Sequence, residues 1–230
     1  MMKTNEIFDK MFEKIPGYLF GLFAFLIGIL GDALALIFSP DYVMWRYSVS
    51  LLGHKTGGPF LRVGLIVSNI LAIPFIIYLG RVIKDEEGNE LIRKLAIGSG
   101  FVTSISAIFT GMFSGDINIV IPFLSDVHGF FAFVSWFSAA IMFAFFSYLM
   151  AKNSKFSKNI RYFGYLVSGI IIFYLIPFII TNICNALPEL CYTFGRFLVV
   201  YVNASLEWLV IFSITTWYLA NSIYIKHKKL

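Results

Sequence analysis

The stretch SGDINIVIPFLSDVHG, residues 114–129, places Asp116, Asp126 and His128 between two long apolar runs of the chain. Ionisable side chains are costly inside hydrocarbon, where a carboxylate at the centre of a span costs about 2.5–3.5 kcal/mol on insertion scales. A short acidic turn between two apolar segments therefore predicts a connection at one surface of a membrane. We expect its polar side chains to face a water-filled cavity or the lipid headgroups.

The composition around this turn is typical of a membrane protein. Of the 230 residues, 59% are hydrophobic and only 13% are charged, and the mean hydropathy is +0.82. Soluble domains carry about 25% charged residues, so the deficit is large. The net charge of +5 does not indicate a nucleic-acid partner, because the basic residues flank the apolar runs as membrane flanks do. We predict an all-α, polytopic helical bundle in the cell membrane.

Six apolar segments have the length of a membrane-spanning helix. They cover residues 17–38, 60–83, 95–113, 127–150, 162–183 and 206–225, which predicts a single transmembrane domain over residues 17–225. Residues 1–16 alternate apolar and charged side chains at helical spacing, which predicts an amphipathic helix at the membrane surface. Residues 226–230 form a basic tail.

The lysines and arginines are distributed unevenly between the two sides of the predicted bundle. An even number of spans places both termini on one side, and 14 of the 18 basic residues fall on that side. Because basic residues are enriched in cytoplasmic connections, we expect both termini in the cytoplasm. The stretch 114–126 then lies outside, together with residues 39–59 and 184–203.

Asp32 is the most unusual residue of the first predicted span. It follows Gly28 by one helical turn, in a stripe of small residues that includes Gly21 and Ala35. Such a stripe lets a neighbouring helix approach closely, so we expect Asp32 to face the bundle rather than lipid. The carboxyl group is then either a ligand or proton site or a structural hydrogen-bond partner of another span.

The other unusual polar residues collect on the same outer half of the predicted bundle. Arg46 and His54 lie in the first outer connection, where they could attract a phosphate, and Glu207 opens the last span. We predict a polar, outward-facing pocket between the first, third, fourth and sixth spans. Its predicted ligand-binding residues are Asp32, Arg46, His54, Asp116, Asp126, His128 and Glu207.

Part of this set also has the composition of a metal site. His54, Asp126 and His128, with Asp32, could supply two imidazoles and a carboxylate to zinc or another divalent metal. Their spacing matches no established ligand motif. A serine at 48 or 50 near His54 would resemble a nucleophile with its base, a pattern that is common by chance. The sequence assigns no catalytic residue.

Cys184 and Cys191 fall in the last outer connection. Outside the cytoplasm a disulfide between them could persist, and a loop of this length can be closed. Free cysteines are also common in apolar surroundings, so both states stay open.

Five short motifs follow or open the predicted spans. They are SLLG at 50–53, GPF at 58–60, GMFSGD at 111–116, HG at 128–129 and EW at 207–208. This pattern resembles the uncharacterised prokaryotic membrane proteins of domain-of-unknown-function family 998 over nearly the whole chain. The resemblance implies six spans and, through a distant similarity to eukaryotic six-span proteins of autophagy and lipid-anchor remodelling, a role with lipids. The triplet RYS at 46–48 departs from the His-Pro-rich approach usual in the family, so no family role is carried onto it.

Three functions are compatible with these patterns. The first is a protein that binds a lipid headgroup or small molecule in the outer pocket, as a transporter or lipid-handling factor. The second is a metal-dependent intramembrane lipid hydrolase or transferase, similar in logic to ceramidase-like hydrolases that use three histidines; here the third, His227, lies in the tail. The third is a structural assembly protein whose carboxylates only join helices. Membrane lipids are the expected partners, and the sequence predicts no oligomeric state.

Overall fold

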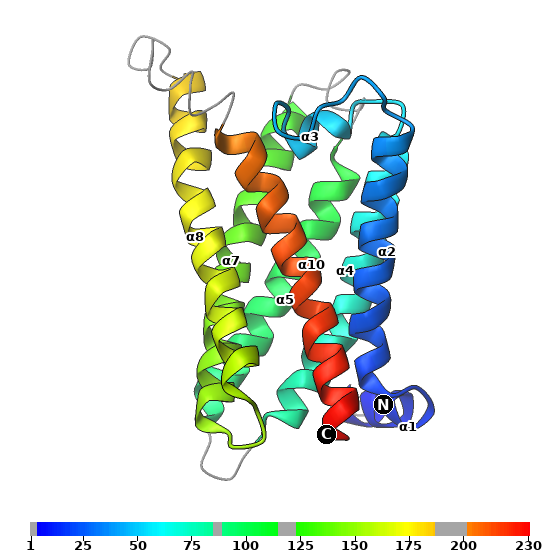
Figure 1. Ribbon diagram of the computed structural model, residues 1–230, viewed down its shortest axis with the longest axis vertical. Helices are drawn as coiled ribbons and strands as arrows, with labels where there is room; N and C mark the ends of the chain where they lie inside the picture. The colour runs from blue at the N-terminus through cyan, green and yellow to red at the C-terminus, as the bar shows by residue number, and fades with distance from the viewer. Residues whose placement is uncertain (1–3, 85–88, 115–122, 187–201) are drawn as a thin grey trace.

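The computed structural model describes residues 4–84, 89–114, 123–186 and 202–230, and over these residues the chain is helical and contains no strand. Six long helices run along one axis, and two shorter helices lie at opposite ends (Figure 1). All six long helices are long and apolar enough to cross a membrane. The long helices are α2 (Gly17–Ile37), α4 (Gly58–Val82), α5 (Glu90–Met112), α7 (Phe123–Lys152), α8 (Lys158–Ala186) and α10 (Asn203–Lys228). The prediction of an all-α bundle with six spans is therefore confirmed.

The observed helices extend beyond the apolar segments that predicted them. Helix α5 begins at Glu90 rather than near residue 95, because the Asn89 side chain accepts hydrogen bonds from the Leu91 and Ile92 amides at 3.1 and 3.2 Å. Helix α7 begins at Phe123, four residues before the predicted span. Hydropathy identifies the part of a helix that lies in hydrocarbon, whereas these helices continue to the depth where charged side chains are solvated.

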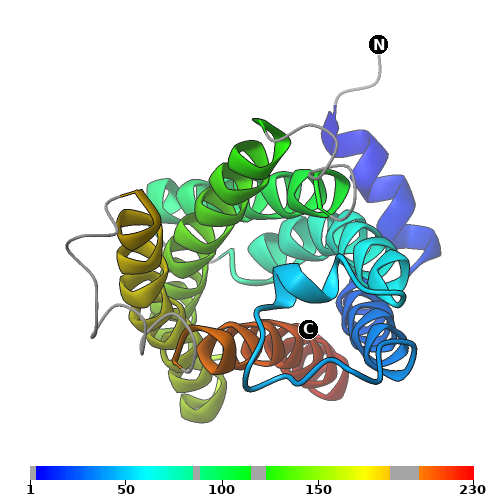
Figure 2. The ribbon, with the colours of Figure 1, turned by 90° about the horizontal axis from the view of Figure 1, so that it is seen from above.

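The six long helices close into a ring. Each packs against its neighbours in chain order, from α2 to α4, α5, α7, α8 and α10, and α10 returns to α2 (Figure 2). Both termini lie at one end of the ring, which we call the terminal end. Helix α3 (Val49–Leu52) lies at the other end, the α3 end, inside the outline of the ring.

Glycines allow α2 and α4 to approach each other closely in this ring. A methyl group added at Gly31 would lie 2.7 Å from the Gly64 Cα and 2.9 Å from the Phe60 carbonyl oxygen. One added at Gly64 would lie 2.8 Å from the Gly31 Cα. The two backbones therefore touch, which is how small residues stabilise helix pairs where lipid offers no hydrophobic drive.

A dense aromatic core fills the middle of the ring toward the terminal end. Trp217 is fully buried, with its ring 4.7 Å from that of Phe143 and 6.2 Å from that of Phe75, both edge to face. Buried apolar residues of α4, α7, α8 and α10 surround this group down to Ile225 near the terminal end. A second, smaller buried cluster packs at the α3 end around Tyr42, Leu52 and Trp208, and a cavity adjoins it.

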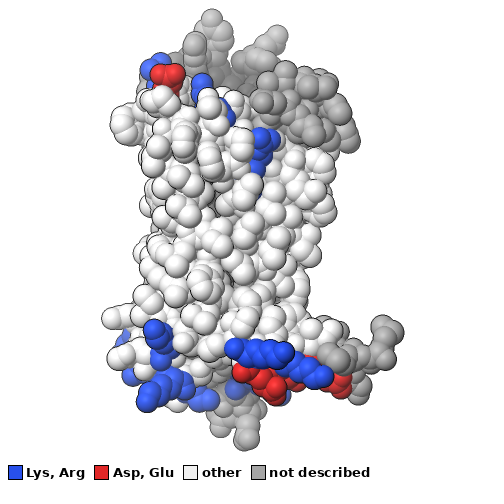
Figure 3. Space-filling model, turned by 90° about the vertical axis from the view of Figure 1, so that its right-hand side faces the viewer, with Lys and Arg blue, Asp and Glu red and all other residues white. Residues whose placement is uncertain are grey.

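Helix α1 (Thr4–Lys14) docks on the terminal end of the bundle. The Phe12 ring lies 5.2 Å from that of Tyr78 and 6.2 Å from that of Phe20, while Asp9 pairs with Arg81 at 2.5 Å. Figure 3 shows one face of the molecule, on which charged side chains gather toward the two ends and leave a broad, nearly uncharged band between them. That band is what a membrane-spanning body requires.

Candidate functional site

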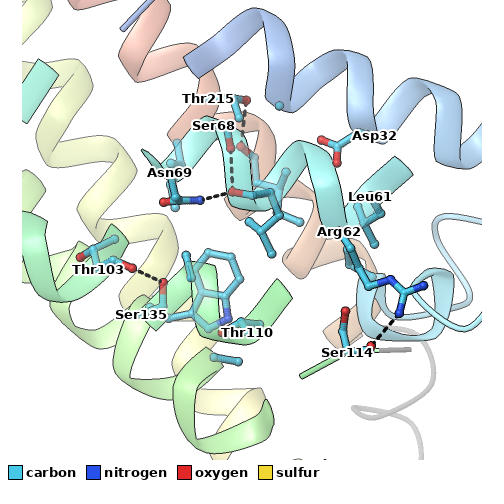
Figure 4. A pocket seen from close by; sticks show the side chains of 18 of the residues that line it. Asp32, Leu61, Arg62, Ser68, Asn69, Thr103, Thr110, Ser114, Ser135 and Thr215 are labelled. Atoms are coloured by element: carbon cyan, nitrogen blue, oxygen red, sulfur yellow. Dashed lines mark hydrogen bonds between the residues drawn. The ribbon is translucent and has the colours of Figure 1, made fainter. Parts of the chain in front are cut away.

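A cavity of about 140 Å³ lies inside the ring near the α3 end. Helices α2, α4, α5, α7 and α10 form its walls, and α3 closes it from above. Alanines and other apolar side chains make up much of the lining. The polar lining residues are Asp32, Ser50, Arg62, Ser68, Asn69, Thr103, Thr110, Ser114, His128, Ser135, Glu207, Thr215 and Tyr218, many of which are drawn in Figure 4.

Asp32 enters the cavity from α2. Its residue surface is only 8% exposed, yet no hydrogen bond or ion pair is formed by its carboxylate with any residue of the described ranges. Buried carboxylates normally have partners, because removing a charge from water is expensive. An unpartnered carboxylate that faces a cavity is therefore the feature of this site that most needs a chemical explanation.

Arg62 enters the same cavity from the facing helix, α4. Its Nη1 donates a hydrogen bond of 3.0 Å to the Ser114 carbonyl oxygen at the end of α5. In Figure 4 the guanidinium points toward Ser114 and away from Asp32. The two opposite charges thus share a cavity without forming an ion pair.

His128 is held from α7 by the backbone of α5. Its Nδ1 lies 3.0 Å from the Thr110 carbonyl oxygen. A carbonyl can only accept, so Nδ1 carries the proton and the neutral imidazole keeps its lone pair on Nε2. The contact fixes the ring at the cavity wall and leaves Nε2 as an acceptor.

Glu207 connects the wall of the cavity to the segment around α3, which covers the cavity and which we call its roof. Its Oε2 accepts a hydrogen bond of 2.9 Å from the Val49 amide, the first residue of α3. This amide is one of the four that a helix N-terminus leaves without an intrahelical partner, so the carboxylate acts as a cap from another helix. Glu207 therefore has a structural task that Asp32 lacks.

The roof is also anchored through Tyr42, in the loop before α3. Its hydroxyl accepts a hydrogen bond of 3.0 Å from the Trp208 Nε1 and lies 2.7 Å from the Tyr47 carbonyl oxygen. Burial raises the pKa of the Tyr42 phenol above its usual value, and the Glu207 carboxylate adds to the rise against the opposing effect of Trp208. The phenol is therefore a neutral group that can donate and accept at once.

A glycine closes the roof loop onto α2. A methyl group at Gly57 would lie 2.1 Å from the Ala35 carbonyl oxygen, so no larger residue fits without moving the backbone. The Gly57 amide donates a hydrogen bond of 3.0 Å to the Ser39 Oγ. The SLLG motif at 50–53 therefore forms a roof that is attached at both ends.

The structure brings together three of the seven predicted site residues. Asp32, His128 and Glu207 all line the cavity. Arg46 is exposed and lies over the Tyr47 ring at 5.7 Å, and His54 is partly buried in the turn after α3; neither is among the lining residues. Asp116 and the Asp126 side chain lie outside the described part of the chain.

The metal and disulfide predictions keep their status as predictions. Among the described residues, no group of three or more His, Cys, Asp or Glu side chains could hold a metal ion. The proposed set of His54, Asp126 and His128 includes a side chain outside that description. Cys191 and the Cys184 side chain likewise lie outside it.

Sequence reasoning missed the contribution of the second span. Neither Arg62 nor Asn69 was among the predicted site residues, whereas both line the cavity. The Asn69 amide bonds within its own helix, to the Leu65 carbonyl oxygen at 2.9 Å. The residues of α4 at positions 61, 65, 68, 69 and 72 repeat at helical spacing, and this mixed polar face was the signal available in the sequence.

Comparison with known proteins identifies the chain by family alone. No curated protein and no solved structure matches it. One family model, described as protein of unknown function (DUF998), matches residues 22–223. This range includes the six long helices except the start of α2 and the end of α10. The chain therefore belongs to the DUF998 family of membrane proteins, as its short motifs predicted.

Proposed function

We propose that this membrane protein binds a lipid headgroup or small molecule in the cavity near the α3 end, as a transporter or lipid-handling factor. The observation that carries the proposal is a partly polar cavity inside the bundle, lined by five of its six long helices and adjoining the buried aromatic core around Trp217. An empty cavity of about 140 Å³ would cost about 3 kcal/mol, so a filled state is favoured. A cavity of similar volume, about 150 Å³, is large enough to bind benzene.

Two glycines provide a matched test of binding. A methyl group at Gly28 would lie 3.5 Å from Thr215 and 3.6 Å from Ser68, so a longer side chain there extends into the cavity. Gly169 meets nothing within 4 Å and is exposed on α8. Gly28→Leu is expected to fill the cavity, and Gly169→Leu to leave it unchanged.

Native mass spectrometry of protein purified in mild detergent measures the outcome. We expect a non-covalent adduct, lipid or small molecule, on the wild type and on Gly169→Leu, and its loss from folded Gly28→Leu. An equal adduct on both leucine variants, or a wild type without any adduct, would contradict binding in the cavity.

We also propose that both termini face the cytoplasm, which places the α3 end and its cavity on the outer side of the cell membrane. The support is the excess of basic residues at the terminal end, 14 of 18. With the two native cysteines replaced, Asp41→Cys should react with a membrane-impermeant maleimide in intact cells, because Asp41 is exposed at the α3 end. Lys229→Cys should react only after permeabilisation, and the reverse pattern would invert the assignment.

A further inference from the structure

The donors and acceptors that line the cavity are not balanced. Ser68 Oγ donates to the Leu65 carbonyl oxygen at 3.1 Å, and Thr215 Oγ1 donates to that of Ile211 at 2.9 Å. Thr110 bonds its own helix in the same way, at 2.8 Å from the Ser106 carbonyl. Each hydroxyl donates its only proton to a backbone oxygen, so it can only accept hydrogen bonds from a group in the cavity.

The same pattern extends to the other polar groups of the lining. His128 uses its Nδ1 proton on the Thr110 carbonyl, which leaves Nε2 as an acceptor. The Ser135 hydroxyl donates to the Thr103 carbonyl at 3.2 Å. The donors in the described lining are Arg62, Trp136, Tyr218 and the second N–H of the Asn69 amide, and the Ser50 hydroxyl shares a hydrogen bond with Ser48 in which either can donate. The cavity is therefore rich in acceptors.

Asp32 adds a carboxyl group to this acceptor-rich lining. Glu207, the other lining carboxylate, is occupied by the Val49 amide, whereas Asp32 has no partner in the described ranges and is 8% exposed. Gly28 lies one turn before Asp32 and also lines the cavity, and Ser68 and Thr215 are the residues nearest to it across the cavity. Arg62 points away from Asp32, so a group that binds between Asp32, Ser68 and Thr215 is best matched by one that supplies hydrogen-bond donors and a positive charge.

We infer that the molecule bound in the cavity carries an ammonium group, which binds the Asp32 carboxylate and the hydroxyl oxygens of Ser68 and Thr215. The inference rests on the proposed function, since it names the chemical class of that ligand. An ammonium group has three donors and no acceptor, which complements a lining whose hydroxyls only accept. The alanine-rich remainder, with Ala72 and Ala107, suits a short apolar body next to the charged group.

A series of three small probes separates charge from size. n-Butylammonium, n-butanol and butyrate have similar bodies and differ in charge, and an alkylamine is protonated at neutral pH. Each is added to the protein in nanodiscs of phosphatidylglycerol, and unfolding is followed by the fluorescence of the four tryptophans. The shift in melting temperature of Gly28→Leu, whose cavity is filled, is subtracted to remove effects of the probes on the bilayer.

We expect n-butylammonium to raise the melting temperature of the wild type more than n-butanol does, and butyrate to have no effect. Asp32→Asn keeps the shape of the side chain and should weaken n-butylammonium binding about tenfold or more, because it replaces a charge-assisted hydrogen bond. Asp41→Asn, which neutralises an exposed carboxylate at the same end, should respond like the wild type. Asp32→Ser serves as a second variant without the carboxyl group. The ranking of the three probes on the wild type tests the inference even if neither variant folds.

The outcomes separate this inference from the proposed function. If n-butanol stabilises the wild type as well as n-butylammonium does, or if Asp32→Asn keeps the preference, the ammonium assignment is overturned while binding in the cavity stands. If no probe acts beyond the Gly28→Leu control and no adduct is found by mass spectrometry, both fail.

A final comparison distinguishes the two sources of such a ligand. Phosphatidylethanolamine carries an ammonium headgroup, so nanodiscs that contain it supply a competitor from the membrane itself. A weaker n-butylammonium response there than in phosphatidylglycerol indicates that the lipid headgroup occupies the site. An unchanged response indicates a soluble amine, and either result supports recognition of an ammonium group.

Discussion

Gly64→Leu is expected to abolish the folded bundle. A methyl group at this position would already lie 2.8 Å from the Gly31 Cα and 3.3 Å from the Ile27 carbonyl oxygen. These are backbone atoms of α2, which cannot rotate away as a side chain could, so α2 and α4 must separate. Overpacking of a core typically costs about 1–3 kcal/mol, and a clash between two backbones should exceed that range.

The measurement is the yield of monodisperse protein and its melting temperature in detergent. Gly98→Leu is the matched control, because a methyl group at Gly98 meets nothing within 4 Å and the residue is exposed on α5. The control should fold with an unchanged or slightly higher melting temperature, since glycine is a poor helix former. A Gly64→Leu protein as stable as the control would mean that the α2–α4 contact is not as close as described.

Glu207→Ala is expected to release the roof of the cavity while the long helices stay folded. The substitution removes the acceptor of the Val49 amide, and a hydrogen bond to a charged group contributes about 1.5–3 kcal/mol. Opening of the segment around α3 should therefore increase about 10- to 100-fold. Hydrogen exchange of residues 47–56 measures this local opening.

Glu207→Gln separates the hydrogen bond from the charge. Its amide oxygen can still accept from the Val49 amide, so the exchange rate should lie between those of the wild type and Glu207→Ala. Exchange around α5 serves as an internal reference, since this helix lies across the ring from α10, the helix that carries Glu207 (Figure 2). Equal protection of residues 47–56 in all three proteins would show that the other contacts, Tyr42–Trp208 and Gly57–Ser39 among them, hold the roof without Glu207.

The sequence predicted the fold well because membrane-spanning helices are encoded by runs of apolar residues. A span must satisfy its backbone internally, so apolar length alone is informative. The helix ends were less predictable. Glu90 and Arg93 read as loop residues, yet they pair at 2.7 Å within the first turn of α5. Charge marks the depth of a residue in the membrane rather than the end of its helix.

The site was predictable where a residue is out of place in a span. Asp32 could be assigned to the bundle interior because Gly28 and Gly31 mark the packed face of its helix. Polar residues near helix ends were harder to assign: Arg46 was predicted for the site and Arg62 was not. Of the two, only Arg62 lines the cavity. Its place on the inner face of α4 depends on how the helices pack, which the neighbouring residues in the sequence do not predict.

The aromatic block around Trp217 closes the cavity on the side of the terminal end. A molecule in the cavity reaches Tyr218, whose ring packs 5.5 Å from that of Trp217 and 5.6 Å from that of Phe75, and these buried rings block the way deeper. It must leave toward the α3 end, unless the helices of the ring separate sideways toward lipid. In this conformation the bundle can hold a molecule but offers no path past those rings. Transport across the membrane would require the rings to repack in every cycle.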